Sequence, residues 1–558
     1  KLDGKIDLQG MSQLLQTTDS ELDPTSKGSI ERDQKGQANK YNYNYWSSPV
    51  SFINSSINNK EYTVDDVLKD GTTINTTPTP SWKNINWVGG YDGSPSDPIS
   101  LARYWIYKFD NLGNNYANWT QIGETGKLKP GLGFTLKGSG ASPGVPGATQ
   151  NLTFVGKPNN GPISIPVLAD QLVLTGNPYP SALDATKFIN DNIGSIEIAT
   201  TNPATDGALY FWEHFSTNSS HNLAAYQGGY GIRNLVGGLA PSATGVDFIS
   251  GVGATSKAIP NQFIPVGQGF FVFGKTGTGG NIIFNNSQRT KFAKESDADS
   301  QQVYRLKPNN KNKKQLRNDT NSSNLENQYT FKTIRLGFNA YAAEFQRQVL
   351  LGFMDDKADS EINDGYDAFN IDDAPTDMYF LNGDNELAIQ GEGYFDENAS
   401  FPIGVRVETA GKVSFGVDAL ENFDTNQAVY IYDAETDIHH PINDALFEIE
   451  LTEGIVNDRF SLRFTDKTLG IKNATFEDAI AIHYTQSSKI LTIANNMKDN
   501  TVETASLFDI QGKAIANWKV TDKEQTNIKI QVQSMTSGVY IVKLKTTKGN
   551  ISKKIIVR

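Results

Sequence analysis

The sequence contains no cysteine in 558 residues and only five histidines. The absence of cysteine excludes disulfides, thiolate-bound zinc, iron–sulfur clusters and cysteine nucleophiles. A metal site would therefore depend mainly on oxygen ligands. No run of about 18 consecutive apolar residues occurs, so we expect no transmembrane helix. The first ten residues lack both a methionine start and an apolar signal core, which indicates processed or truncated material.

Acidic residues outnumber basic ones by 62 to 50, giving a net charge of −12. Nucleic acids and anionic membrane surfaces attract proteins with a positive field, so neither is an expected partner. The chain is too long for one hydrophobic core, and about three or four domains are expected.

Short apolar or aromatic runs separated by Asp-Gly, Asn-Gly and Gly-Gly turns are typical of β-structure. Examples of these runs are Tyr104–Phe109 and Gln268–Phe273. We therefore expect an all-β protein built from several β-sandwiches. A short helix is predicted at Ala182–Asn190, with Ser181 and Asp184 in the two positions of a capping box.

Composition shifts divide the chain into four parts. Residues 1–295 form a large β-rich module with room for two subdomains. Residues 296–328 are polar and predict a linker with one short strand. Residues 329–470 predict a β-sandwich, because Phe460, Leu462 and Phe464 alternate with polar residues. Residues 471–558 predict about seven strands, which fits a small immunoglobulin-like domain.

Two short motifs imitate enzyme signatures. Gly269–Thr276 matches the P-loop pattern, but its four middle residues are bulky and strand-like where a phosphate needs exposed backbone. Gly140–Gly144 matches the nucleophile elbow, but prolines and glycines surround Ser142 and no helix pattern follows. We interpret the first as a core strand and the second as a loop.

Histidines near carboxylates are the other candidates for catalysis. Glu213 and His214 are adjacent, so in a strand they point to opposite faces. His221 follows nearby, and His439 with His440 repeats the pattern. We interpret these groups as structural or solvated, name no catalytic residue, and expect a protein that is not an enzyme.

One stretch is rich in carboxylates that Ca²⁺ could use, since this ion takes six to eight oxygen ligands. Solvated turns are the favoured interpretation, because the spacing does not fit an EF-hand. No other cofactor is expected. The calcium candidates are Asp355, Asp356, Asp364 and Asp367, among neighbours that include Asp359, Glu361, Asp372, Asp373 and Asp377.

Residues 41–119 are rich in aromatic side chains, which either fill sandwich cores or stack on sugar rings. The core interpretation is favoured, and a glycan-binding surface stays open as the alternative. The residues are Tyr41, Tyr43, Tyr45, Trp46, Trp82, Trp87, Tyr91, Trp105 and Trp119.

The end of the chain resembles the type A C-terminal sorting domain of type IX secretion substrates in Bacteroidota. Three blocks carry the resemblance, at Ser506–Gly512, Met535–Leu544 and Ser552–Arg558. They match an "xDxxGK" turn, a "GxY" strand and a basic last strand at the extreme C-terminus. The matching residues are Asp509, Gly512, Lys513, Gly538, Tyr540, Lys553, Lys554 and Arg558.

This resemblance implies that the domain is the export and sorting signal, recognised by an outer-membrane translocon and a shuttle β-barrel. It also implies a secreted protein of the bacterial surface, associated with the outer membrane. The resemblance also implies that a sortase-like protease can remove the domain after export.

Upstream segments resemble a module that recurs near the C-termini of large flavobacterial surface proteins and has no assigned catalytic activity. They are Tyr43–Val50, Val155–Gly161, Gly176–Leu183, Leu209–His214, Val266–Phe271 and Ile283–Arg289. Both resemblances lead us to expect an adhesin or a gliding-related display protein. The alternatives are a surface polysaccharide-binding protein and the non-catalytic part of a larger secreted hydrolase.

Overall fold

The computed structural model forms two compact units, residues Lys1–Asp466 and Lys467–Arg558. The residues described are 1–10, 12–71, 82–110, 118–140, 149–193, 203–214, 220–222, 228–244, 259–289, 331–372, 374–466, 480–485, 489–495, 501–509, 513–520, 527–532, 536, 538–547 and 549–557. Strands dominate both units, which confirms the all-β prediction. No helix among the described residues is long and apolar enough to cross a membrane.

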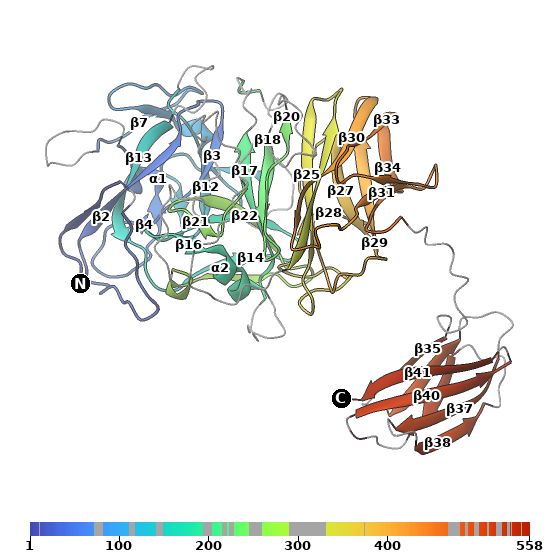
Figure 1. The fold of residues 1–558 in the computed structure, drawn as a ribbon. Coiled ribbons are helices and arrows are strands. Elements are labelled where there is room, and N and C mark those ends of the chain that lie inside the picture. Colours follow the sequence, from blue (N-terminus) through green and yellow to red (C-terminus); the bar gives the residue numbers. More distant parts are fainter. Residues whose placement is uncertain are drawn as a thin grey trace. The chain divides into compact units, whose positions relative to one another are not determined.

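The first unit contains two lobes, coloured blue to green and yellow to orange in Figure 1. Two five-stranded sheets form the larger part of the first lobe. One contains β1 (Lys5–Leu8), β2 (Ser29–Gln37), β13 (Thr149–Pro158), β4 (Val50–Ser51) and β6 (Leu68–Asp70). The other contains β15 (Leu172–Gly176), β22 (Gly269–Gly274), β17 (Thr205–His214), β18 (Gly228–Arg233) and β19 (Gly238–Leu239).

Six two-stranded ladders complete the first lobe. They are β3 (Tyr43–Ser47) with β12 (Gly133–Lys137), β5 (Tyr62–Thr63) with β11 (Lys127–Leu128), β7 (Asn86–Val88) with β8 (Ser100–Ala102), β9 (Tyr107–Lys108) with β10 (Thr120–Gln121), β14 (Ile163–Val167) with β23 (Gly280–Phe284), and β16 (Leu183–Asp184) with β21 (Phe263–Ile264). The helical pieces are α1 (Val64–Val67), η1 (Arg103–Trp105), α2 (Ala185–Asn192) and η4 (Asn286–Gln288).

The predicted helix exists, but its start was wrong by three residues. Leu183 and Asp184 pair with β21, so the helix begins only after them. The Asp184 carboxylate accepts the backbone N–H of Thr186 at 3.0 Å and therefore acts as the N-cap itself.

The second lobe is one curled sheet of twelve strands around its own core. Its strands are β20 (Ala243–Thr244), β24 (Lys332–Ala340), β25 (Phe345–Phe353), β26 (Ala368–Phe369), β27 (Asp377–Asn382), β28 (Asn385–Glu392), β29 (Ser400–Val407), β30 (Gly411–Glu421), β31 (Tyr430–Asp433), β32 (Ile438–Pro441), β33 (Phe447–Leu451) and β34 (Gly454–Arg463). The alternating residues Phe460, Leu462 and Phe464 are buried in this core, as their period predicts.

The two lobes share a hydrophobic cluster, and strand β25 belongs to both sides of it. All nine residues of β25 are buried. Val349 packs into the second lobe's core, whereas Leu350 packs with Tyr210 and Phe271 of the first lobe. The predicted linker at 296–328 lies outside the described residues, and the lobes on either side of it form one compact unit.

A buried ion pair lies beside this junction. The Arg347 guanidinium is 2.9 Å from Asp372 and 2.5 Å from Asp377, and all three side chains are nearly inaccessible. Asp372 also accepts the backbone N–H of Tyr230 from the first lobe at 3.1 Å. The two carboxylates offset the cost of burying the Arg347 charge, and the contact with Tyr230 ties the lobes together.

Several segments of the upstream resemblance meet in a buried polar network of the first lobe. The Asn159 amide donates to the carbonyls of Ser48 and Pro178, at 3.0 and 2.9 Å. Arg289 donates to the Ser181 hydroxyl at 2.8 Å and lies over the ring of Tyr179. Burial lowers the pKa of Arg289 to about 10. These side chains satisfy loop backbone that water cannot reach, so we assign them a structural role.

The second unit has seven strands among its described residues, in two sheets packed over a common core. One sheet has the order β35 (Ile480–Thr485), β36 (Ile490–Asn495), β39 (Asn527–Gln531). The other has the order β38 (Ala514–Lys519), β37 (Val502–Asp509), β40 (Gly538–Thr546), β41 (Gly549–Val557). This agrees with the predicted seven-stranded sandwich.

Candidate functional site

The most elaborate side-chain cluster of the first lobe surrounds Trp105, at the end of η1. Trp105 is 5% exposed, and its ring nitrogen donates to the carbonyl of Tyr91 at 2.6 Å. The Thr135 hydroxyl of β12 donates to the Trp105 carbonyl at 2.7 Å. We call this cluster the Trp105 site and define it as Tyr91, Asp92, Tyr104, Trp105, Lys137 and His221.

Lys137 is the buried cation of the Trp105 site. It ends β12 and pairs in register with Tyr43 of β3. Its ammonium lies 3.7 Å from the centre of the Trp105 ring and 4.4 Å from that of Tyr43. Burial lowers the pKa of Lys137 to about 7, with the charge of Asp92 opposing this shift. The two aromatic faces also favour the charged form.

His221 connects the buried and exposed parts of the site. Its ring stacks on Trp105 with an interplanar angle of 18° and a centroid distance of 4.9 Å. One ring nitrogen lies 3.3 Å from the Lys137 ammonium, and the other lies 2.8 Å from Asp92. Asp92 also pairs with Lys40 at 3.0 Å. The hydrogen bonds from His221 and Lys40 lower the pKa of Asp92, so this carboxylate stays ionised and accepts hydrogen bonds.

Two tyrosines form the outer surface of the Trp105 site. Tyr91 is 58% exposed and Tyr104 is 36% exposed. Their rings meet at 88° with centroids 4.8 Å apart. An aromatic face can stack on a sugar ring. The neighbouring carboxylate, imidazole and ammonium groups can hydrogen-bond the hydroxyls of the same sugar.

The structure buries some of the predicted aromatic side chains and leaves others partly or fully exposed. Tyr45, Trp46 and Trp105 are buried. Tyr41, Tyr43, Trp82, Trp87 and Trp119 are half-buried, and Tyr91 is exposed. Sequence reasoning missed Lys137, Asp92 and Lys40, because nothing in their local pattern indicates that they meet His221.

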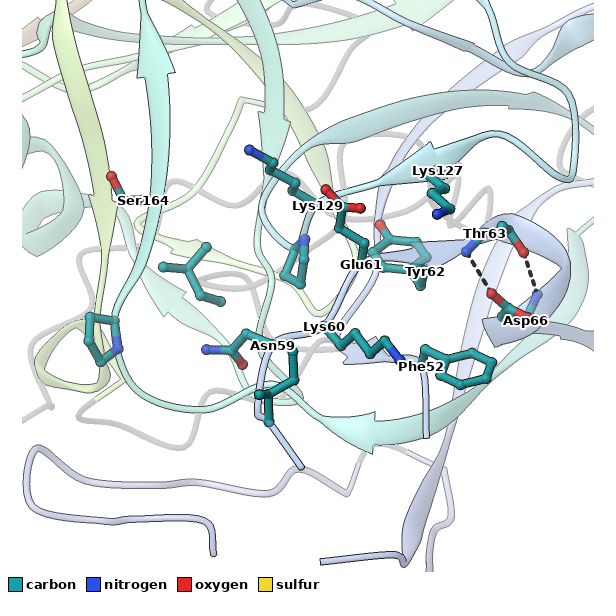
Figure 2. A pocket seen from close by; sticks show the side chains of 14 residues that line it. Phe52, Asn59, Lys60, Glu61, Tyr62, Thr63, Asp66, Lys127, Lys129 and Ser164 are labelled. Carbon is teal, nitrogen blue, oxygen red and sulfur yellow. Dashed lines mark hydrogen bonds between the residues drawn. The ribbon is translucent and has the colours of Figure 1, made fainter. Parts of the chain in front are cut away.

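The first lobe also has an open cleft of about 700 Å³, shown in Figure 2. We call it the lysine cleft. It lies beside the β5–β11 ladder and is lined by Phe52, Ile57, Asn59, Lys60, Glu61, Tyr62, Thr63, Asp66, Lys127, Lys129, Pro130, Pro162, Ile163 and Ser164. None of these residues was a sequence-based candidate, since they come from three separate segments of the chain.

Two positions give the lysine cleft its shape. Asn59 has a positive φ of 53° and exchanges hydrogen bonds with the backbone of Asn160 at 2.8 and 3.0 Å. Thr63 and Asp66 form the capping box of α1, in which the Asp66 carboxylate accepts the Thr63 N–H at 2.9 Å. These bonds hold both sides of the cleft in place.

The predicted sorting residues come together at one end of a sheet. Asp509 pairs with Tyr540, which in turn pairs with Ile555 of the last strand. The Asp509 carboxylate accepts the backbone N–H of Lys513 at 2.9 Å, which closes the β37–β38 turn. Gly538 pairs with Val557 at the same end. Three motifs that are far apart in sequence are thus adjacent in space.

The remaining sorting residues lie close to this end. The Tyr540 hydroxyl donates to the carbonyl of Thr536 at 2.9 Å, while its ring is buried in the core. On β41, Lys553 and Lys554 pair with Val542 and Ile541 of β40, and Lys554 is exposed. Gly512 and Arg558 lie outside the described residues.

Two of the four calcium candidates, Asp364 and Asp367, are held by other contacts. Asp364 pairs with Lys275. Asp367 accepts the backbone N–H groups of Asn363 and Gly391 at 2.6 and 2.8 Å, and burial raises its pKa to about 7. Asp355 has a φ of 55°, and the Asp356 side chain is 72% exposed. Among the residues that the structure describes, no three His, Asp or Glu side chains are grouped to hold a metal. The calcium site stays a prediction.

The structure describes part of the two motifs that imitate enzyme signatures, and the contacts of two candidate histidines. Residues Gly269–Gly274 of the P-loop-like run form the buried strand β22, as expected. Residues 141–144 of the elbow-like run lie outside the described residues. His214 is buried and lies 2.6 Å from the backbone nitrogen of Tyr43, and His440 stacks on Phe447.

Comparison with known proteins adds two family matches. Residues 87–464 match the family described as "Domain of unknown function (DUF8693)", and residues 487–558 match the "Secretion system C-terminal sorting domain". No curated protein matches the chain. A solved "Biofilm associated protein - BSP domain" is 10% identical, with 94% of this chain and 95% of that chain covered, but the TM-score of 0.15 supports no argument.

The first match contains every residue of the Trp105 site, whereas the contacting residues Lys40 and Tyr43 precede it, and the second match contains every predicted sorting residue. The sorting domain implies interaction with the type IX secretion machinery and export out of the cell to its surface. The chain belongs to the DUF8693 family and, through its C-terminal sorting domain, is a substrate of the type IX secretion system.

Proposed function

We propose that this protein is an adhesin of the bacterial surface, with residues 1–466 as the binding unit and the C-terminal domain as its address. The support is the combination of a sorting domain with a large all-β unit that exposes an aromatic site. The proposal assigns no catalysis to the chain. A gliding-related display protein is a variant of this proposal, in which binding to a surface serves the movement of the cell.

The observation that carries the proposal is the exposed pair Tyr91–Tyr104. Large aromatic side chains are costly to leave in water, so a perpendicular exposed pair next to hydrogen-bonding groups favours a ligand with both apolar and hydroxyl faces. A surface polysaccharide has this chemistry. Asp92 is kept ionised by its partners and would accept hydrogen bonds from sugar hydroxyls.

A glycan array probed with the full chain tests this function. We expect binding to a defined group of glycans, and a loss of about tenfold or more in affinity for Tyr91→Ala, because stacking on one ring contributes on the order of 1–2 kcal/mol. Tyr394→Ala is the matched control, since Tyr394 is 72% exposed and lies in the second lobe. An array without any bound sugar would contradict the proposal.

For export, we propose that the shuttle β-barrel and translocon recognise the end of the sheet that carries Asp509, Lys513 and Gly538, together with Lys553 and Lys554. Within the described part of the chain, the last strand, β41, pairs with β40 alone in its sheet and is therefore an edge strand. An edge strand has unpaired backbone groups, so a partner can add to it. Association with the outer membrane after export belongs to this proposal.

A further inference from the structure

The lysine cleft combines features that the Trp105 site does not have. Lys60, Lys127 and Lys129 line it, and none of the three makes an ion pair with a described residue. Some other lysines of the same lobe are paired: Lys5 with Glu31, Lys83 with Asp97 and Lys108 with Asp110. Figure 2 shows Lys60 next to Phe52 on one segment, and Lys127 and Lys129 on a second segment.

The carboxylates of the cleft offset only part of the charge of these lysines. Asp66 is engaged by the backbone N–H of Thr63 in the capping box. Glu61 is exposed and pairs with none of the three lysines. Three lysines against two carboxylates leave the lining with an excess of one positive charge, in a protein whose net charge is −12.

Apolar surface is also exposed in the cleft. Phe52 is 41% exposed and Ile57 is 49% exposed, while Pro130, Pro162 and Ile163 add further apolar lining. The Lys60 ammonium lies 5.0 Å from the centre of the Phe52 ring. A ligand that fits must therefore offer a flat apolar face and an anionic group side by side.

We propose that the lysine cleft binds an acidic polysaccharide, with a sugar ring packed on Phe52 and its carboxylate held by the lysines. The inference rests on the proposed function, in which residues 1–466 bind surface glycans. The cleft volume of about 700 Å³ falls within the range of ligand pockets, about 300–1,000 Å³. Lysine ammonium groups are strongly hydrated point charges that bind such anions without fixed geometry.

The overall negative charge does not prevent this binding. At physiological ionic strength, fields between exposed charges are screened beyond about 8 Å. A carboxylate inside the cleft therefore experiences mainly the charges of the lining, which have an excess of one positive charge, whereas the distant acidic residues are screened. The same reasoning predicts that affinity falls as salt is added.

Calorimetric titration of the full chain with a hexuronate oligosaccharide, and with a neutral oligosaccharide of equal length, tests the inference. We expect the acidic oligosaccharide to bind more tightly, and the double variant Lys127→Gln/Lys129→Gln to lose about tenfold in affinity. Lys27→Gln/Lys35→Gln is the control, because it removes the same charge from exposed lysines outside the cleft. We expect it to change the affinity less than about twofold.

Three outcomes would overturn the inference: no binding of the acidic oligosaccharide, an equal loss in both double variants, or complete competition by inorganic phosphate, which would indicate a small-anion site. Glycan binding that depends on Tyr91 separates the two proposals. If that binding persists while the cleft variants change nothing, only the lysine cleft is wrong. If no glycan of either kind binds, the proposed function fails as well.

Discussion

The Trp105 site and the lysine cleft both bring lysines next to aromatic rings, yet burial gives these lysines different roles. Lys137 is 3% exposed between Trp105 and Tyr43, and burial lowers its pKa to about 7. Lys60 lies over Phe52 and is half-buried in the lining of an open cleft. A lysine enclosed by rings becomes part of the scaffold, whereas an open lysine keeps its charge available for a ligand.

The largest expected difference between the two regions is the loss of stability when the aromatic ring beside the lysine is removed. Trp105→Ala should lower the free energy of unfolding by about 3–5 kcal/mol, because it removes a buried ring on which Lys137, His221 and Tyr91 depend. Phe52→Ala should change it by only about 0.5 kcal/mol, since that ring is partly in water. Urea unfolding of the two variants measures both values. Equal losses would mean that the two regions do not differ in burial as described.

A smaller difference between the two regions concerns the dependence of folding stability on pH. The folded-state pKa of Lys137 lies below its ordinary value of 10.5, so between about pH 7 and 10.5 the unfolded chain binds more protons than the folded one. Stability should therefore rise with pH across this window, by at most about 1.4 kcal/mol per pH unit. Below about pH 7 this dependence on Lys137 should end.

Unfolding curves at pH 7, 8 and 9 check this prediction. Lys137→Met should flatten the rise, because methionine fills a similar space without a titrating group. Lys127→Met in the lysine cleft is the control and should leave the rise in place. If the rise in stability with pH persists in Lys137→Met, a titrating group other than Lys137 causes it.

The sequence predicted the elements whose pattern is local. The alternation of Phe460, Leu462 and Phe464 identified a core strand, and the bulky residues of Gly269–Gly274 identified another. The helix start was misplaced, because the pairing of Leu183 and Asp184 with β21 competes with helix formation and involves residues about 80 positions away.

The contacts between distant segments could not be read from the sequence. The strand β25 contains the polar run Gln346–Gln348, yet Arg347 pairs with Asp377 and the whole strand is buried between the lobes. His221 was considered with Glu213 and His214, whereas its partners are Asp92 and Lys137. The sorting motif was recognisable because its residues keep fixed positions near the chain end, and pairing across β37, β40 and β41 brings them together.

Surface labelling in the native host is the measurement that tests the central claim most directly. The full chain is compared with a version that ends at Asp478 and lacks the sorting domain. The account predicts that the full chain reaches the surface and the shortened chain stays within the cell envelope, with residues 1–466 still folded. Equal labelling of both at the surface would contradict the role of the C-terminal domain as the export address.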